Sequence, residues 1–270
     1  MYNDSIRNLM LPALATLLLM LNESCNIMKQ RPKDTFVLVH GGFHGAWCWD
    51  KLKPLMEKKG FRVITPDHTG QGKELYHYTD NIGALLEKQE RPVMLLGHSS
   101  GGMVITELAK KYPGKIKGLI YLSAFLLPEG MSPPEIMRND TVSLMSSSLI
   151  TDESNGTISV DKKKAKQLFY ADCEDAIAQW AIDRLSPEPV VPMGNKKPGQ
   201  KNMVSPQPIP RFYIETLNDN ALGISSQRHM QTLSSCDKIY TLSSGHSPFL
   251  SQPAKLATVL TEISDFINEK

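Results

Sequence analysis

Ser99 stands at the centre of Gly97-His98-Ser99-Ser100-Gly101, which has the spacing G-x-S-x-G. A serine hydroxyl is a weak nucleophile until a neighbouring base takes its proton, and a sharp turn between a strand and a helix exposes it to a substrate. Glycines in this turn leave room for the strand and the helix to approach closely. These residue types indicate a nucleophile elbow with Ser99 as the nucleophile. The alternative is a Gly/Ser turn that carries no chemistry.

A serine nucleophile needs a general base and an acid that orients the base. Two histidines follow Ser99 in the chain, His229 and His246. His246 lies in a polar loop between the last predicted strand and the last predicted helix, where a mobile imidazole could reach the elbow. His229 lies in a helical stretch and is expected at the surface. We therefore assign His246 as the base.

The acid is expected between the serine and the histidine in the chain order of such hydrolases. Asp219 follows the predicted strand 211–215 by a few residues and is our candidate. Asp237 is the first alternative, but it opens the next strand and would lie at the other edge of the sheet. Glu215 stands at a strand end and would need a different loop path.

Acyl transfer also needs backbone N–H groups that stabilise the negative oxygen of the tetrahedral intermediate. One donor would be Ser100, which follows the nucleophile at the start of a helix. The second donor is expected from the loop after the first strand, which contains His40-Gly41-Gly42. Gly42 is our candidate, because a small residue lets its amide approach the oxygen. The alternative is that these glycines serve a tight turn alone.

The elements that must position these residues alternate between short apolar runs and longer helical patterns, which predicts an α/β fold with a mostly parallel sheet flanked by helices. The predicted strands are 35–39, 62–65, 93–96, 117–122, 211–215 and 238–242, and the predicted helices are 47–58, 81–90, 101–112, 163–170, 176–185 and 253–267. Sheets of this kind bind ligands at the carboxyl ends of their strands.

The alternation breaks between about 125 and 210, where prolines and polar loops surround two helical stretches. This segment is too long for a plain connection between two strands. We interpret it as a cap inserted into a single domain that spans 31–270, and we place the cap over the carboxyl ends of the strands.

Residues 1–30 differ from the rest of the chain. The run 9–21 is apolar apart from one threonine, which is typical of a signal peptide and too short for a stable membrane span. We expect export to the periplasm or out of the cell. A lipid anchor at Cys25 is one form of export, although 22–24 departs from the usual lipobox. The alternative is a cytoplasmic protein with a disordered extension.

The composition narrows the classes of partner. A formal net charge of +2 gives no strong attraction to nucleic acid. None of the four cysteines forms a C-x-x-C pair and no histidines cluster at metal spacing, so we expect neither a metal nor a cofactor. The sequence leaves open one disulfide in an exported protein, and it leaves a homodimer open beside a monomer.

Four stretches resemble the plant methylesterase and hydroxynitrile lyase branch of the α/β-hydrolase fold superfamily. They are 39–49 (VHGGFHGAWCW), the elbow 97–102, 213–228 with Tyr213-Ile214, Asp219 and Gln227-Arg228, and 245–256 around GH…LSQP…KL. The similarity runs from about Phe36 to the C-terminus and is weakest in the cap. It implies the α/β-hydrolase fold, the catalytic triad Ser99, Asp219 and His246, and an oxyanion hole from the N–H groups of Gly42 and Ser100. The signal-like N-terminus suggests a bacterial relative.

Two departures from the lyases bear on the reaction. Hydroxynitrile lyases of this branch have a threonine after the first histidine and a lysine after the catalytic histidine, where this chain has Gly41 and Ser247. Without that ammonium group a leaving cyanide has no charge partner, so ester hydrolysis is favoured. We therefore predict a serine esterase that acts on a small-molecule carboxylic ester. A hydroxynitrile lyase, a lactonase and a non-catalytic ligand-binding protein on the same fold are the alternatives.

Overall fold

A computed structural model of the chain describes residues 33–67, 75–189 and 208–269. The predicted signal-like segment 1–30, with Cys25, lies outside these residues. The chain divides into Met1–Lys33 and Asp34–Lys270, and all the elements below belong to the second part. In the described stretches, every helix is too short or too polar to cross a bilayer.

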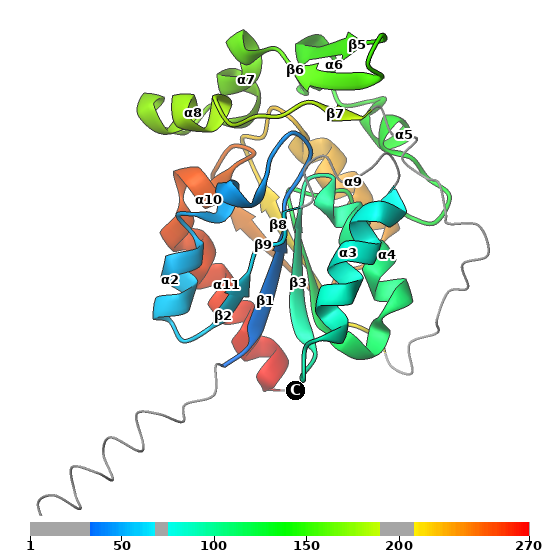
Figure 1. Ribbon diagram of the computed structural model, residues 1–270, viewed down its shortest axis with the longest axis vertical. Helices are drawn as coiled ribbons and strands as arrows, with labels where there is room; N and C mark the ends of the chain where they lie inside the picture. The colour runs from blue at the N-terminus through cyan, green and yellow to red at the C-terminus, as the bar shows by residue number, and fades with distance from the viewer. Residues whose placement is uncertain (1–32, 68–74, 190–207, 270) are drawn as a thin grey trace, which may run out of the picture. The chain divides into compact units, whose positions relative to one another are not determined.

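A six-stranded sheet forms the centre of Asp34–Lys270, with the strand order β2-β1-β3-β4-β8-β9 and parallel pairing throughout (Figure 1). Its strands are β1 (Thr35–Val39), β2 (Arg62–Ile64), β3 (Val93–His98), β4 (Ile116–Leu122), β8 (Arg211–Thr216) and β9 (Lys238–Leu242). Every residue of β3 is buried, because helices cover both faces of the sheet. The predicted α/β fold, with a parallel sheet flanked by helices, is confirmed.

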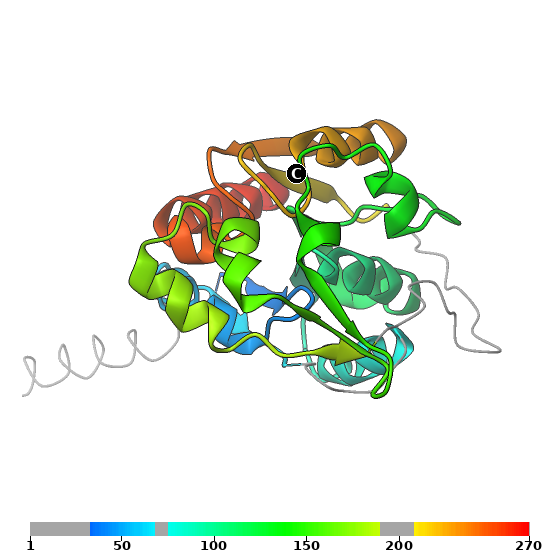
Figure 2. The same ribbon diagram turned by 90° about the horizontal axis from the view of Figure 1, so that it is seen from above.

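Helices cover the two faces of this sheet in separate groups (Figures 1 and 2). One group comprises α3 (Leu75–Glu87), α4 (Gly101–Lys111) and α9 (Ile224–Leu233), and the other comprises α2 (Lys53–Lys58) and α11 (Pro253–Asn268). The short helices η1 (Ala46–Trp49) and α10 (Pro248–Ser251) pack into the core of the second group. The short helix η2 (Pro113–Lys115) follows α4 and contacts it.

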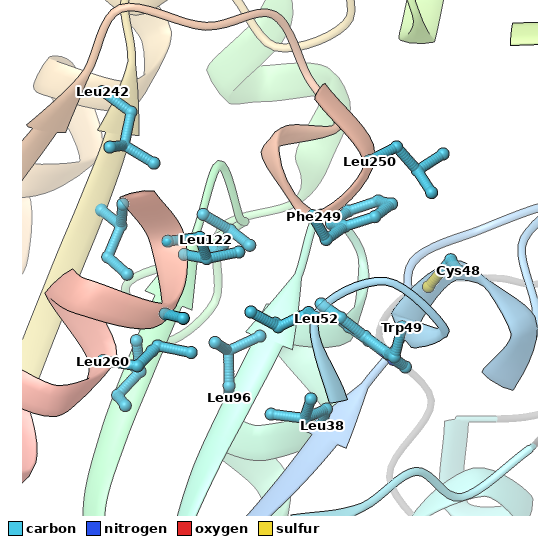
Figure 3. Close-up of a cluster of buried hydrophobic side chains, with 14 of the residues drawn as sticks. Leu38, Cys48, Trp49, Leu52, Leu96, Leu122, Leu242, Phe249, Leu250 and Leu260 are labelled. Carbon is cyan, nitrogen blue, oxygen red and sulfur yellow. The ribbon is translucent and has the colours of Figure 1, made fainter. Parts of the chain in front are cut away.

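Alternate residues along each strand pack into two different cores. Leu38, Leu96 and Leu122 lie on neighbouring strands and share one core with residues of α2 and α11 (Figure 3). Their chain neighbours Val37 and Leu95 belong to the other core, beneath α3 and α4. Full burial of such a side chain contributes about 2 kcal/mol, so a register slip of one residue would exchange both cores and is strongly disfavoured.

The cap is formed by described residues 123–189, which follow β4. It contains α5 (Pro133–Met137), α6 (Met145–Ser148), β5 (Leu149–Asp152), β6 (Thr157–Val160), α7 (Lys162–Phe169), α8 (Asp175–Ile182) and β7 (Glu188–Pro189). Strands β5, β6 and β7 form a small antiparallel sheet that the sequence did not predict. In Figure 1 these elements lie beyond the carboxyl ends of the large sheet.

Candidate active site

Ser99 occupies a strained turn between β3 and α4. Its φ of +52° is left-handed, a conformation that costs a non-glycine residue about 1–2 kcal/mol. Ser99 N–H donates to Leu122 O at 3.3 Å, and Ser99 O accepts the Phe125 N–H at 3.0 Å, so the backbone of β4 and its following loop hold the turn. A Cβ on Gly101 would lie 2.7 Å from Val39 O, which shows why glycine is needed where α4 meets β1.

His246 lies in the loop after β9, and its Nδ1 is 2.7 Å from Oδ2 of Asp219. Both side chains are buried. A carboxylate can only accept a hydrogen bond, so the imidazole proton sits on Nδ1 and the lone pair sits on Nε2. His246 Nε2 is buried and has no hydrogen-bond partner among the described residues. This arrangement leaves Nε2 available to take a proton.

The Asp219 carboxylate is fixed by four further donors. Oδ1 accepts the N–H groups of Ala221 and Leu222 at 2.8 and 2.9 Å. Oδ2 accepts from Thr216 Oγ1 at 3.0 Å and from Gln227 Nε2 at 3.3 Å. The role of Gln227 was not predicted, although a glutamine among the apolar positions of a helix is a signal for a buried hydrogen-bonding role.

His98 connects the turn at Ser99 with the loop that carries His246. Its Nε2 donates to His246 O at 2.9 Å, and the two rings lie 4.5 Å apart between centroids. Burial, and secondarily the neighbouring His246, lowers the pKa of His98 well below its usual value, so His98 is neutral.

The loop after β1 lies directly against the elbow. A Cβ on Gly41 would lie 2.7 Å from Ser99 Cβ, so only glycine allows this approach. Nδ1 of His44 is 2.8 Å from Gly42 O, and Nε2 is 2.8 Å from the hydroxyl of Tyr170 in the cap. Because Gly42 O can only accept, His44 donates from Nδ1 and Tyr170 donates to Nε2. Burial lowers the pKa of His44 to about 3, which keeps it neutral.

A cavity of about 570 Å³ opens beside these groups, and Gly42, Ser99 and Ser100 line it. Most of its remaining wall is apolar and comes from α3, α4 and the cap. Phe169 of the cap lines the cavity and stacks on the His246 ring at 5.5 Å between centroids. The cavity therefore gives an apolar ligand access to the Ser99 hydroxyl.

Of the predicted residues, Gly42, Ser99 and Ser100 line the cavity, and Asp219 and His246 form a hydrogen-bonded pair. The backbone of His246 is in contact with His98, the residue before Ser99. The alternative acids are engaged elsewhere. Asp237 accepts the Arg211 N–H at 3.0 Å, at the amino end of β8. Glu215 pairs with Arg228 at 2.9 Å.

The side chains that could bind a metal ion, and the cysteine thiols, do not form a cluster in the described part of the chain. Within the described ranges, no group of three or more His, Cys, Asp and Glu side chains is arranged to hold a metal ion. Three cysteines, Cys48, Cys173 and Cys236, are free thiols, and burial raises the pKa of each.

Known proteins are similar to this chain in sequence and in fold. A sequence model described as Alpha/beta hydrolase family matches residues 36–259. The chain is 30% identical to the pyrethroid hydrolase of Sphingobium wenxiniae, over 85% of this chain and 87% of that protein. It is 33% identical to putative methylesterase 11 of Arabidopsis thaliana, over 85% of this chain and 63% of that protein. The crystal structure of a pyrethroid hydrolase from Sphingobium faniae has a TM-score of 0.72 at 27% identity, with 88% of this chain and 99% of that chain covered.

Proposed function

The chain belongs to the alpha/beta hydrolase family, and on that basis we propose that it is a serine hydrolase that cleaves a small carboxylic ester through an acyl-enzyme on Ser99. The observation that carries this proposal is the buried hydrogen bond between Asp219 and His246, which leaves His246 Nε2 without a partner among the described residues. His98, beside Ser99, donates a hydrogen bond to the backbone of His246 and so connects this pair with the elbow. A protein that only binds a ligand has no need of a proton acceptor oriented in this way.

The first half-reaction forms the acyl-enzyme. Ser99 Oγ attacks the ester carbonyl carbon while His246 Nε2 takes the hydroxyl proton. Asp219 stabilises the resulting imidazolium through Nδ1–H. The tetrahedral intermediate collapses when His246 returns the proton to the leaving alkoxide, so that the alcohol departs and the acyl group remains on Ser99.

The second half-reaction frees the enzyme. Water attacks the acyl carbon and gives a proton to His246 Nε2, and the second tetrahedral intermediate expels Ser99 Oγ, which regains that proton. In both intermediates the N–H groups of Gly42 and Ser100 donate to the negative oxygen. Each such donor is worth about 3 kcal/mol of transition-state stabilisation.

The cavity supports an apolar substrate. Its wall is mainly aliphatic, aromatic and methionine side chains, and its volume of about 570 Å³ fits a small organic ester. The matched relatives are named as a pyrethroid hydrolase and a methylesterase, which agrees with this substrate class. Gly41 and Ser247 stand where hydroxynitrile lyases carry threonine and lysine, so hydrolysis is favoured over cyanohydrin cleavage.

A substrate panel tests the proposal. Purified protein would be assayed with methyl esters, p-nitrophenyl esters and lactones of matched acyl length. We expect turnover of the open-chain esters at least about a hundredfold above the rate with heat-inactivated protein, since oxyanion stabilisation and general-base catalysis each contribute at least that factor. Preference for lactones would place the enzyme among lactonases. Ligand binding without turnover of any member would contradict the proposal and indicate a binding protein.

A further inference from the structure

Phe43 follows the proposed oxyanion donor Gly42 and has an unusual backbone. Its φ is +65°, in the left-handed region that a residue with a side chain rarely adopts. Phe43 is buried and lines the cavity, so its backbone cannot relax without moving the wall of the site. The Gly42 C=O and the Phe43 N–H belong to one rigid peptide group, and Gly42 O accepts a hydrogen bond from His44 Nδ1 at 2.8 Å. The contacts that hold this peptide group therefore restrict the backbone of Gly42 on its carbonyl side.

Residues of the cap form hydrogen bonds with both backbone groups of Phe43, its carbonyl oxygen and its N–H. Ser186 N–H donates to Phe43 O at 3.0 Å. The Phe43 N–H donates to the carboxyl group of Glu188, the first residue of β7. Two hydrogen bonds from a three-residue stretch of the cap therefore fix one residue of the loop after β1, and they offset the cost of its left-handed conformation.

Glu188 is also in contact with the loop at Gly42 itself. A Cβ on Gly42 would lie 3.1 Å from Glu188 Oε2 and 3.6 Å from Ser100 Oγ. Glu188 is partly buried and lines the cavity beside Ser99. Burial raises the pKa of its carboxyl group, against the opposing effects of the Phe43 N–H and of His40. A raised pKa reduces the negative charge near the place where the oxyanion develops.

We propose that Glu188 is a positioning residue for the oxyanion hole: its carboxyl oxygen, acting through Phe43, keeps the Gly42 N–H directed at the carbonyl oxygen of a substrate attacked by Ser99. This inference rests on the proposed ester hydrolysis. It assigns to the cap a part in the catalytic step in addition to its part in lining the cavity.

The hydrogen bond from the Phe43 N–H to the Glu188 carboxyl group determines which substitutions of Glu188 test the proposal. Glutamine keeps a carbonyl oxygen that can accept the Phe43 N–H, whereas leucine keeps the size of the side chain and removes the acceptor. Asp183 is an exposed carboxylate of the same cap, and Asp183→Ala is the matched control. Glu188→Ala is a second test variant that introduces no new bulk. Melting temperatures of all four variants establish that they are folded.

Steady-state kinetics with a p-nitrophenyl ester distinguish a role of Glu188 in positioning the oxyanion hole from a role in substrate binding alone. We expect Glu188→Leu and Glu188→Ala to lower kcat about 10- to 100-fold with KM changed less than about threefold, because the lost interaction acts in the transition state. We expect Glu188→Gln to keep kcat within about threefold of the wild type. A wild-type kcat in Glu188→Leu, a change confined to KM, or a Glu188→Gln as impaired as Glu188→Leu would overturn the proposal.

Crystal structures of the wild type, Glu188→Gln and Glu188→Leu give a readout that does not depend on turnover. We expect a positive φ at Phe43 in the wild type and in Glu188→Gln, and its loss in Glu188→Leu. An unchanged Phe43 backbone in Glu188→Leu would overturn the positioning role even if the wild type hydrolyses esters. Conversely, a wild type without esterase activity would refute the proposed function, while the structures would still decide whether Glu188 holds the loop.

Discussion

Asp172, in the loop between α7 and α8, accepts the N–H of Gly245 at 2.9 Å, so the cap contacts the residue that precedes His246. A Cβ on Gly245 would lie 2.7 Å from Asp172 Oδ1, so a side chain at this position would displace the Asp172 carboxylate. The cap therefore holds the loop of the proposed base here, as it holds the loop of the proposed oxyanion donor at Phe43. The cap therefore contacts two loops beside the elbow, the one that contains Phe43 and the one that contains His246.

Removal of this contact should slow turnover modestly. One hydrogen bond of this kind is worth about 1 kcal/mol, so we expect Asp172→Ala to lower kcat up to about fivefold. Asp183→Ala, in the same cap, should leave kcat unchanged. Initial rates with a p-nitrophenyl ester measure both. Equal rates for the two variants would show that Asp172 does not support the His246 loop.

Asp219→Asn should impair turnover severely while the fold persists. Oδ1 accepts two backbone N–H groups, so the asparagine oxygen should take that place and its NH₂ group should face His246 Nδ1. Nδ1 must then accept, the ring proton moves to Nε2, and the base is lost. We expect kcat to fall about 10³- to 10⁴-fold. Asp237→Asn, at the other edge of the sheet, is the control, and similar losses in both variants would contradict the assignment of Asp219.

Gly41→Ala should damage the site because of one close approach. The new methyl group would lie 2.7 Å from Ser99 Cβ, so either the elbow or the oxyanion loop must move. We expect kcat/KM to fall at least about tenfold and the melting temperature to drop, since overpacking typically costs 1–3 kcal/mol. At Gly114 a Cβ would meet nothing within 4 Å, and Gly114→Ala should have neither effect. A fully active Gly41→Ala would show that the loop is not packed against the elbow.

Asp34 should make stability depend on acid pH. Burial opposes its ionisation, but hydrogen bonds from Lys117, Ser264 and Asn268 outweigh that effect and lower its pKa. A lowered folded-state pKa stabilises the fold above the unfolded pKa of about 4, and this stability is lost as the pH falls further. We expect Asp34→Asn to lower the free energy of unfolding at pH 7, measured by urea titration, by about 2 kcal/mol. The difference from the wild type should shrink below pH 4, and a constant difference would contradict this account.

The sheet was predictable because its strands are short apolar runs bounded by polar or glycine residues. The predicted strands 35–39 and 238–242 have the same bounds as β1 and β9. Helix ends were less accurate. The predicted helix 47–58 is in fact η1 and α2, separated by a turn, and Pro54 in the first turn of α2 was a signal for this break. The predicted helix 81–90 corresponds to α3, which begins at Leu75.

The proposed catalytic residues could be chosen from the sequence because they follow strand ends and match a motif with a known geometry. The residues that support them could not. Tyr170 bonds His44 across 126 positions of the chain, and His98 bonds the backbone of His246 across 148. Such contacts leave no periodic pattern, and their partners are set by how the cap folds back over the sheet. The small sheet of β5, β6 and β7 was missed for the related reason that its strands have four residues or fewer.

The acyl-enzyme on Ser99 is the central claim, and mass spectrometry tests it directly. Wild-type protein and Ser99→Ala would be quenched in acid during turnover of p-nitrophenyl acetate, digested and analysed. We predict that the wild type gains one acetyl group on the peptide that contains Ser99. We predict that Ser99→Ala gains none and hydrolyses no ester, although its circular dichroism and melting temperature match the wild type. Acetylation at another residue, or sustained turnover by Ser99→Ala, would contradict the account.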